Sequence, residues 1–83
     1  MILLDTCALL WLVMEPARLS PRAKSLIKAI GARLTVSAIS AFEIAVKARK
    51  RKLDLKLSPE EWWQTALAHH GIASIPITAE IAL

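Results

Sequence analysis

The chain has few of the residues on which covalent cross-links and glycine-rich sites depend. Its 83 residues include one cysteine and two glycines. A single cysteine excludes a disulfide within the chain and fits a reducing compartment. The two glycines, Gly31 and Gly71, stand far apart, so no glycine-rich loop is present that could wrap a phosphate group.

Long apolar runs are also missing. The longest unbroken one, residues 7–14, is far too short to cross a bilayer, and residues 1–4 lack the basic start of a signal peptide. We therefore expect a soluble, cytoplasmic protein with no membrane partner. Hydrophobic residues nevertheless make up 55% of the chain. A domain of this size buries only about 60 to 65% of its extended-chain surface, so we expect it to oligomerise or to belong to something larger.

Acidic residues are outnumbered, with 7 Asp and Glu against 11 Lys and Arg and a net charge of +4. Most of the excess lies in one stretch, at Lys47, Arg49, Lys50, Arg51 and Lys52, followed by Lys56. Such a block attracts phosphate and is typical of nucleic-acid binding. Cations can also offset the macrodipole at a helix end and stay solvated. The block exceeds what capping needs, so we predict that residues 47–52 bind the phosphate groups of a nucleic acid.

The apolar periodicity predicts alternating strands and helices. Strands are expected at residues 1–4, 34–37 and 72–75, and helices at 7–14, 21–30, 39–50 and 59–70, with a last helix beginning after 78. This order predicts an α/β fold with a parallel sheet and helices on its faces. We expect the second strand beside the first and the third outermost. Residues 53–57, where leucines alternate with polar residues, fit either an edge strand or an arm over a groove.

Several residues are expected to set helix ends and packing. Ser20 and Ser58, each followed by proline, predict helix N-caps, and Gly31 and Gly71 predict helix C-caps. The helix after Ser20 is expected to bury Ala23, Leu26, Ile27 and Ile30. Cys7 is expected to be a small buried hydrophobe.

Asp5 directly follows the first predicted strand. A carboxylate at the carboxyl end of a buried strand lies where open α/β sheets bind ligands. Asp5 could equally be the N-cap of the next helix, since its oxygens accept hydrogen bonds from free N–H groups of the first turn. Asp5 alone does not decide between these interpretations.

Glu43 is the second candidate site residue, placed among Ile39, Phe42 and Val46 on what we take to be the apolar side of its helix. Two structural alternatives are a capping box with Ser40 and an i,i+4 ion pair with Lys47. The parallel topology favours a site, because it brings Glu43 to the same sheet edge as Asp5. Two carboxylates without a Cys/His cluster suit Mg²⁺ or Mn²⁺, and such a metal can promote phosphodiester hydrolysis.

Several segments together resemble PIN-domain ribonucleases of the VapC kind, the toxins of type II toxin-antitoxin modules. The segments are LLDT at 3–6, ALLW at 8–11, LSP at 19–21, VSA at 36–38, EIAVK at 43–47, KLDL at 52–55 and IPIT at 75–78. The resemblance implies a three-layer α/β/α fold, Mg²⁺- or Mn²⁺-dependent endoribonuclease activity, a cognate antitoxin and a homodimer. It also implies that Asp5 and Glu43 are the first two acids of the metal site. Thr6, Ser37 and Ser40 are predicted to support them. With RNA as the implied substrate, the cations predicted to bind it are Lys47, Arg49, Lys50, Arg51 and Lys52.

Members of this family continue beyond the position of Leu83 with a third and often a fourth acid. We therefore expect residues 1–83 to be the N-terminal portion of a single PIN domain, without activity as they stand, and with a first strand that pairs with another segment or chain. Two further hypotheses remain open. One is a non-catalytic fragment that binds antitoxin or dimerises through Trp62, Trp63 and residues 53–57. The other is a basic nucleic-acid-binding module using residues 47–56.

Overall fold

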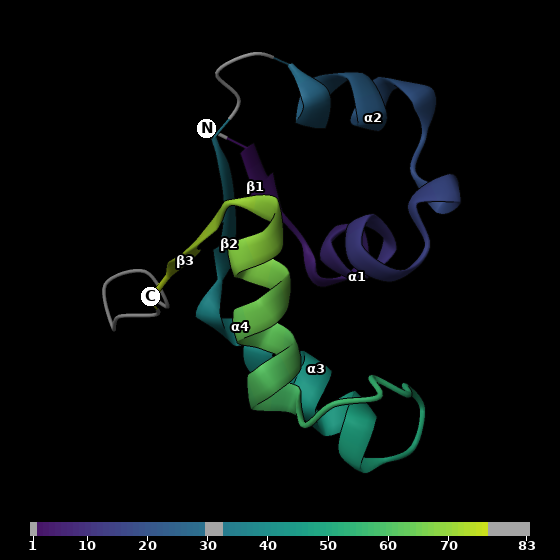
Figure 1. Cartoon of the computed structure of the whole chain (residues 1–83), viewed down its shortest axis with the longest axis vertical. Coiled ribbons are helices and arrows are strands. Elements are labelled where there is room, and N and C mark those ends of the chain that lie inside the picture. Colours follow the sequence, from purple (N-terminus) through teal and green to yellow (C-terminus); the bar gives the residue numbers. More distant parts are fainter. Residues whose placement is uncertain (1, 30–32, 77–83) are drawn as a thin grey trace.

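A computed structural model describes residues 2–29 and 33–76, and at its centre is a parallel sheet of three strands. The strands are β1 (Ile2–Leu4), β2 (Leu34–Ser37) and β3 (Ile72–Ile75), in the order β1-β2-β3 (Figure 1). Leu4 of β1 is in register with Val36 of β2, which is in register with Ser74 of β3. The predicted α/β class, strand direction and strand order are confirmed.

Helices connect the strands. After β1 come α1 (Thr6–Met14), a short 3-10 helix (Pro16–Arg18) and α2 (Pro21–Lys28). Between β2 and β3 come α3 (Ala38–Arg49) and α4 (Pro59–His70), which pack together below and in front of the sheet in Figure 1. None of the helices described has the length and apolar character that a membrane crossing requires.

Local capping signals fix several helix ends as predicted. The Ser20 Oγ accepts a hydrogen bond from the Ala23 N–H at 3.1 Å, and the Ser58 Oγ accepts one from the Glu61 N–H at 3.2 Å. Gly71 follows the last turn of α4 with φ +64°, a left-handed conformation that glycine adopts without a steric penalty. These three predictions are confirmed.

The core lies on one face of the sheet. Its buried side chains are Leu4, Leu9, Leu34, Val36, Ile44, Leu55, Trp62, Ala66 and Ile72. Because strand side chains alternate between faces, Leu3 and Ala73 lie on the opposite face, and both are exposed. No helix covers them in the part of the chain that the structure describes, so the three-layer arrangement stays a prediction.

The expected packing of α2 is wrong. None of its residues is buried, Leu26 is 51% exposed, and Ile27 alone packs against the core. The reason is its position, since α2 lies at the periphery beyond the 3-10 helix (Figure 1). The helix ends at Lys28, and the predicted residues Ile30 and Gly31 lie outside the described residues.

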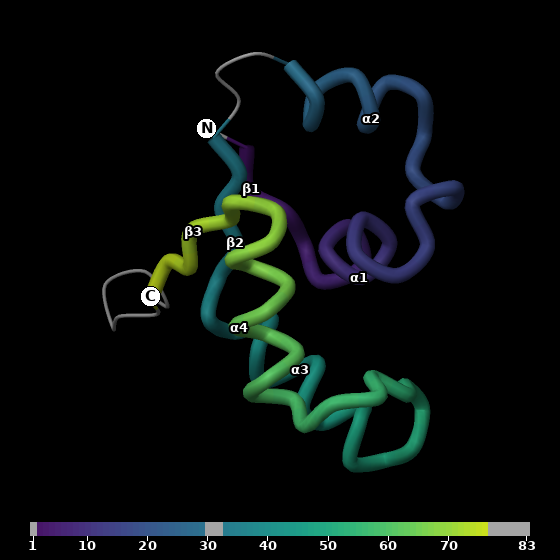
Figure 2. Tube along the Cα trace, viewed as in Figure 1, coloured from purple at the N-terminus to yellow at the C-terminus, as the bar shows by residue number. Residues whose placement is uncertain are grey.

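Two further sequence predictions concern Cys7 and the segment at 53–57. Cys7 is exposed rather than buried, because α1 turns Leu9 and Thr6 toward the interior instead. Residues 53–57 form no strand, so the edge-strand alternative is wrong. They form an irregular arm between α3 and α4 (Figure 2) that places Leu55 in the core. The helix predicted after residue 78 lies outside the described residues.

Candidate functional site

A small hollow opens at the carboxyl ends of β1 and β2. It measures about 220 Å³ and is lined by Leu3, Leu4, Asp5, Thr6, Ser37, Ile39, Ser40 and Glu43. Parallel strands bring their carboxyl ends to one sheet edge, and the helices that follow them begin there. The predicted candidate acids Asp5 and Glu43 therefore line the same hollow, together with the three predicted supporting residues.

Asp5 is the N-cap of α1. Its Oδ1 accepts a hydrogen bond from the Ala8 N–H at 2.6 Å, and its backbone is extended. The capping interpretation of Asp5 is thus confirmed. It does not compete with a ligand role, since a carboxylate has a second oxygen and further lone pairs that the cap leaves available. The cap also fixes the direction of the carboxylate at the edge of the hollow.

Glu43 is held by a network of hydroxyl groups. The Thr6 Oγ1 lies 2.9 Å from the Glu43 Oε1 and 2.9 Å from the Ser40 Oγ. Thr6 has one hydroxyl hydrogen, and an ionised carboxylate can only accept. Thr6 therefore donates to Glu43 and accepts from Ser40. Thr6 and Ser40 are both buried, so their hydroxyl groups are shielded from water, and they orient the Glu43 carboxylate, which is itself exposed.

The two structural alternatives for Glu43 are wrong. Helix α3 begins at Ala38, with the Ser37 Oγ accepting from the Ile39 N–H at 3.2 Å, so Ser40 lies inside the helix and forms no capping box. The ion pairs within residues 2–29 and 33–76 join Arg18 to Glu15 and Lys56 to Asp54, and neither involves Glu43.

The side of α3 that carries Glu43 is exposed, although it was expected to be the buried, apolar side. Ile39 and Phe42, taken as the apolar side, are 51% and 68% exposed, and Glu43 is exposed with them. Ser40 and Ile44 are the buried residues of the helix. These two are four positions apart and so share a face, the one that the sheet and α4 cover.

The hollow has a distinct electrostatic character. Two carboxylates face it, and none of its lining residues is Lys, Arg or His. The N-termini of α1 and α3 both begin at its rim, which places positive dipole ends there. A hard cation would offset the repulsion between the acids, because all the donors available here are oxygens. Within the described residues, no group of three or more acidic, histidine or cysteine side chains could hold a metal.

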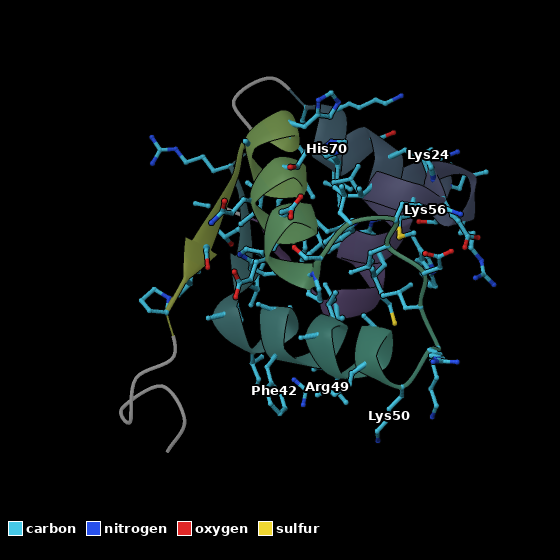
Figure 3. The ribbon with its side chains drawn as sticks, turned by 60° about the horizontal axis from the view of Figure 1, so that its bottom comes forward. Lys24, Phe42, Arg49, Lys50, Lys56 and His70 are labelled. Atoms are coloured by element: carbon cyan, nitrogen blue, oxygen red, sulfur yellow. The ribbon has the colours of Figure 1, made fainter. Side chains whose placement is uncertain are left out.

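The predicted RNA-binding cations are not in the hollow. Lys47 is half-buried within α3, and Arg49, Lys50, Arg51 and Lys52 are exposed at the other end of that helix (Figure 3). At about 1.5 Å of rise per residue, the seven residues from Glu43 to Lys50 span about 10 Å. The structure thus places the cations at and just beyond the far end of α3, the helix that carries Glu43, and not around the hollow.

A comparison with protein families gave one match. The profile described as the PIN domain matches residues 2–83, nearly the whole chain. Among curated proteins and among solved structures, no match was found.

Proposed function

The chain belongs to the PIN-domain family, whose members are generally nucleases that use divalent metals, and from this premise we propose that it is a Mg²⁺- or Mn²⁺-dependent endoribonuclease of the VapC toxin type. In this proposal residues 1–83 all belong to one PIN domain. Its substrate is RNA, its partners are a cognate antitoxin and a second copy of the chain, and it acts in the cytoplasm.

The observation that supports the proposal best is the pairing of two differently anchored acids in one hollow. Asp5 is fixed by the Ala8 N–H and Glu43 by the Thr6 hydroxyl, and each retains an oxygen that these bonds do not use. Neither acid has a cationic side chain beside it in the hollow.

The lining of the hollow fits a hard divalent ion. Asp5 and Glu43 would hold it, with waters completing the shell, as Mg²⁺ sites with one or two carboxylates usually do. No sulfur or imidazole donor lines the hollow to favour a softer metal. A bound ion supplies a polarised phosphoryl oxygen and an activated water. The chain's own residues keep the two acids oriented toward the substrate.

The partner proposals rest on exposed apolar surface. Leu3 on edge strand β1 is 63% exposed, and Leu57 of the arm is 46% exposed. A second copy or an antitoxin segment could bury these side chains, and an unpaired strand edge is a common place for such addition. The sequence resemblance to VapC toxins is the reason for naming an antitoxin.

The test is metal-dependent cleavage of RNA by the intact PIN domain that contains residues 1–83, and by two isosteric variants of it. Asp5→Asn and Glu43→Gln keep side-chain shape and hydrogen-bonding oxygens but remove the charges that would bind metal. Both should abolish Mg²⁺-dependent cleavage and weaken Mn²⁺ binding measured by calorimetry. Glu60→Gln, an exposed acid on α4, is the matched control and should behave like the parent protein. Unchanged cleavage in both site variants would refute the metal site.

A second candidate function is a non-catalytic role. The exposed cations at Arg49, Lys50, Arg51 and Lys52 favour a simple nucleic-acid-binding module, and the exposed leucines favour a fragment that only binds antitoxin or dimerises. Metal-independent, strongly salt-dependent RNA binding without cleavage would indicate the first. Partner binding with no affinity for metal or RNA would indicate the second.

A further inference from the structure

Helix α3 carries an aromatic side chain that the fold does not use. Phe42 is 68% exposed, more than any other large hydrophobic residue among those described as exposed. It stands three positions after Ile39, which lines the hollow, so the two side chains are neighbours on α3 and Phe42 lies next to the rim of the hollow. Figure 3 shows Phe42, Arg49 and Lys50 projecting from the same outward side of α3, away from the body of the protein. We name these three residues the outer stripe.

Helix geometry explains why the outer stripe is continuous. Seven residues, the spacing from Phe42 to Arg49, complete about two turns, so the two side chains lie almost in line along the helix. Lys50 is adjacent in sequence and flanks that line. The stripe therefore runs from the rim of the hollow to the basic end of α3 over about 10 Å.

Single exposed hydrophobic residues are ordinary on protein surfaces, and cations at a helix C-terminus offset its dipole. These explanations account for each residue separately. They do not account for an exposed ring aligned with two cations and placed next to a pair of acids. Proteins that bind unpaired nucleic acid combine these same two elements, aromatic rings for stacking and cations for phosphates.

We propose that the outer stripe is the path of the RNA strand into the site, with Phe42 stacked on an unpaired base beside the hollow. Arg49 and Lys50 bind phosphates of the same strand farther from the hollow. This inference rests on the proposed function and adds two features to it. One is a residue that positions the substrate, and the other is the direction along which the RNA strand approaches the site. Charge complementarity favours RNA over a protein partner, because Arg51 and Lys52 continue the cationic surface beyond the stripe.

The test is RNA binding without metal, in the Asp5→Asn background and in the presence of a chelator, so that cleavage plays no part. Fluorescence anisotropy with an unstructured RNA oligonucleotide gives Kd. Phe42→Ala should raise Kd by about 10-fold or more, the loss expected for one stacked base, and Phe42→Trp should restore it. Leu26→Ala on α2, a similarly exposed apolar residue, is the matched control and should leave Kd unchanged.

Salt dependence tests the cationic part of the stripe. Replacing Arg49 and Lys50 together by Ala should lower the slope of log Kd against log salt by about 1.4, or about 0.7 for each phosphate contact with a single strand. Replacing Arg22 and Lys28 on α2, which are also exposed, should leave the slope unchanged. A fully paired RNA duplex should be insensitive to Phe42→Ala, because it has no unpaired base to stack.

Three outcomes would overturn the inference. Phe42→Ala could match the Leu26→Ala control, the duplex could lose as much affinity as the single strand, or Phe42→Ala could abolish binding of a protein partner and leave RNA binding intact. The last result would make the stripe a protein-docking surface. Failure of the proposed function is distinguishable, because a protein that never cleaves RNA could still bind it through Phe42. Circular dichroism of the Phe42 variants confirms that they are folded.

Discussion

Thr6 and Glu43 are 37 positions apart in the chain, and their side-chain oxygens lie 2.9 Å apart. This hydrogen bond joins the first turn of α1 to the middle of α3. Ser40, on the preceding turn of α3, completes the network from the buried side. One candidate acid, Glu43, is thus oriented by the residue directly after the other candidate acid, Asp5.

Replacing Thr6 by Val should reduce both stability and activity. Valine has nearly the shape of threonine but no hydroxyl, so Glu43 loses its donor and the buried Ser40 hydroxyl loses its partner. Loss of such a bond costs about 1 to 3 kcal/mol of unfolding free energy, measured by urea denaturation. Loss of an orienting group around a metal site lowers metal affinity or activity by about 10-fold to about 100-fold.

Two variants serve as controls for this prediction. Thr6→Ser keeps the hydroxyl and should recover most of the activity. Thr65→Val, on an exposed position of α4, should change neither quantity. If Thr6→Val lowered stability but left Mn²⁺ affinity and cleavage untouched, the network would be structural only.

The two roles of Asp5 can be separated by comparing Asp5→Asn with Asp5→Ala. Asparagine is as good an N-cap as aspartate, whereas alanine loses the bond to the Ala8 N–H and costs about 1 kcal/mol of unfolding free energy. Both changes remove the charge. We expect the cleavage rate of both variants to fall by about 100-fold or more. Removing a metal ligand should cost at least as much as removing one of the groups that orient it.

The measurement is thermal or urea unfolding in a chelator, alongside the cleavage rate. Asp5→Asn should unfold with the parent protein and Asp5→Ala earlier. An Asp5→Asn variant that cleaves RNA at the parent rate would leave Asp5 as a helix cap and nothing more.

The elements with local signals could be predicted from the sequence. Ser-Pro pairs at 20–21 and 58–59 mark helix starts, and Gly71 marks a helix end, because each effect depends on atoms within one helical turn. The parallel order of the strands followed from the alternation of strands with helices. Asp5 and Glu43 could be placed at one sheet edge by the same reasoning.

The orientation of α3 and the hydroxyl network could not be predicted in this way. Helix α3 is apolar on more than one side, with Ile39 and Phe42 on one and Ile44 on another, so periodicity does not decide which side is buried. Packing against the rest of the fold decides it. The contact of Thr6 with Ser40 spans 34 positions and has no local sequence signal, although both were expected to support the site.

Acid should destabilise the fold partly through His70. Burial, and secondarily the nearby charge of His69, lowers the pKa of His70 from 6.5. The unfolded chain therefore takes up this proton more readily than the folded one. The contribution of neutral His70 to stability is complete above pH 6.5 and is lost as the pH falls through the lowered pKa of the folded state.

His70→Gln should consequently reduce the loss of unfolding free energy between about pH 8 and about pH 5, measured by urea denaturation at each pH. His69→Gln removes only the smaller cause of the lowered pKa of His70. The unfolding free energy of this variant should therefore retain more of the pH dependence than that of His70→Gln. A His70→Gln protein with the full acid sensitivity of the parent would assign that sensitivity to other groups.

Substitution of Leu3 should test whether β1 is an association surface. Strand β1 is at the end of the described sheet, all three of its residues are apolar, and Leu3 is 63% exposed. Such an edge has no charge or proline to prevent pairing with another strand. Leu3→Lys adds a charge there without touching the core, so it should shift the protein toward monomer in sedimentation measurements over a range of concentrations.

Leu26→Lys, at a comparably exposed position on α2, should leave the assembly unchanged. If the Leu26 variant dissociated and the Leu3 variant did not, the copies would associate through α2 rather than through the edge of the sheet.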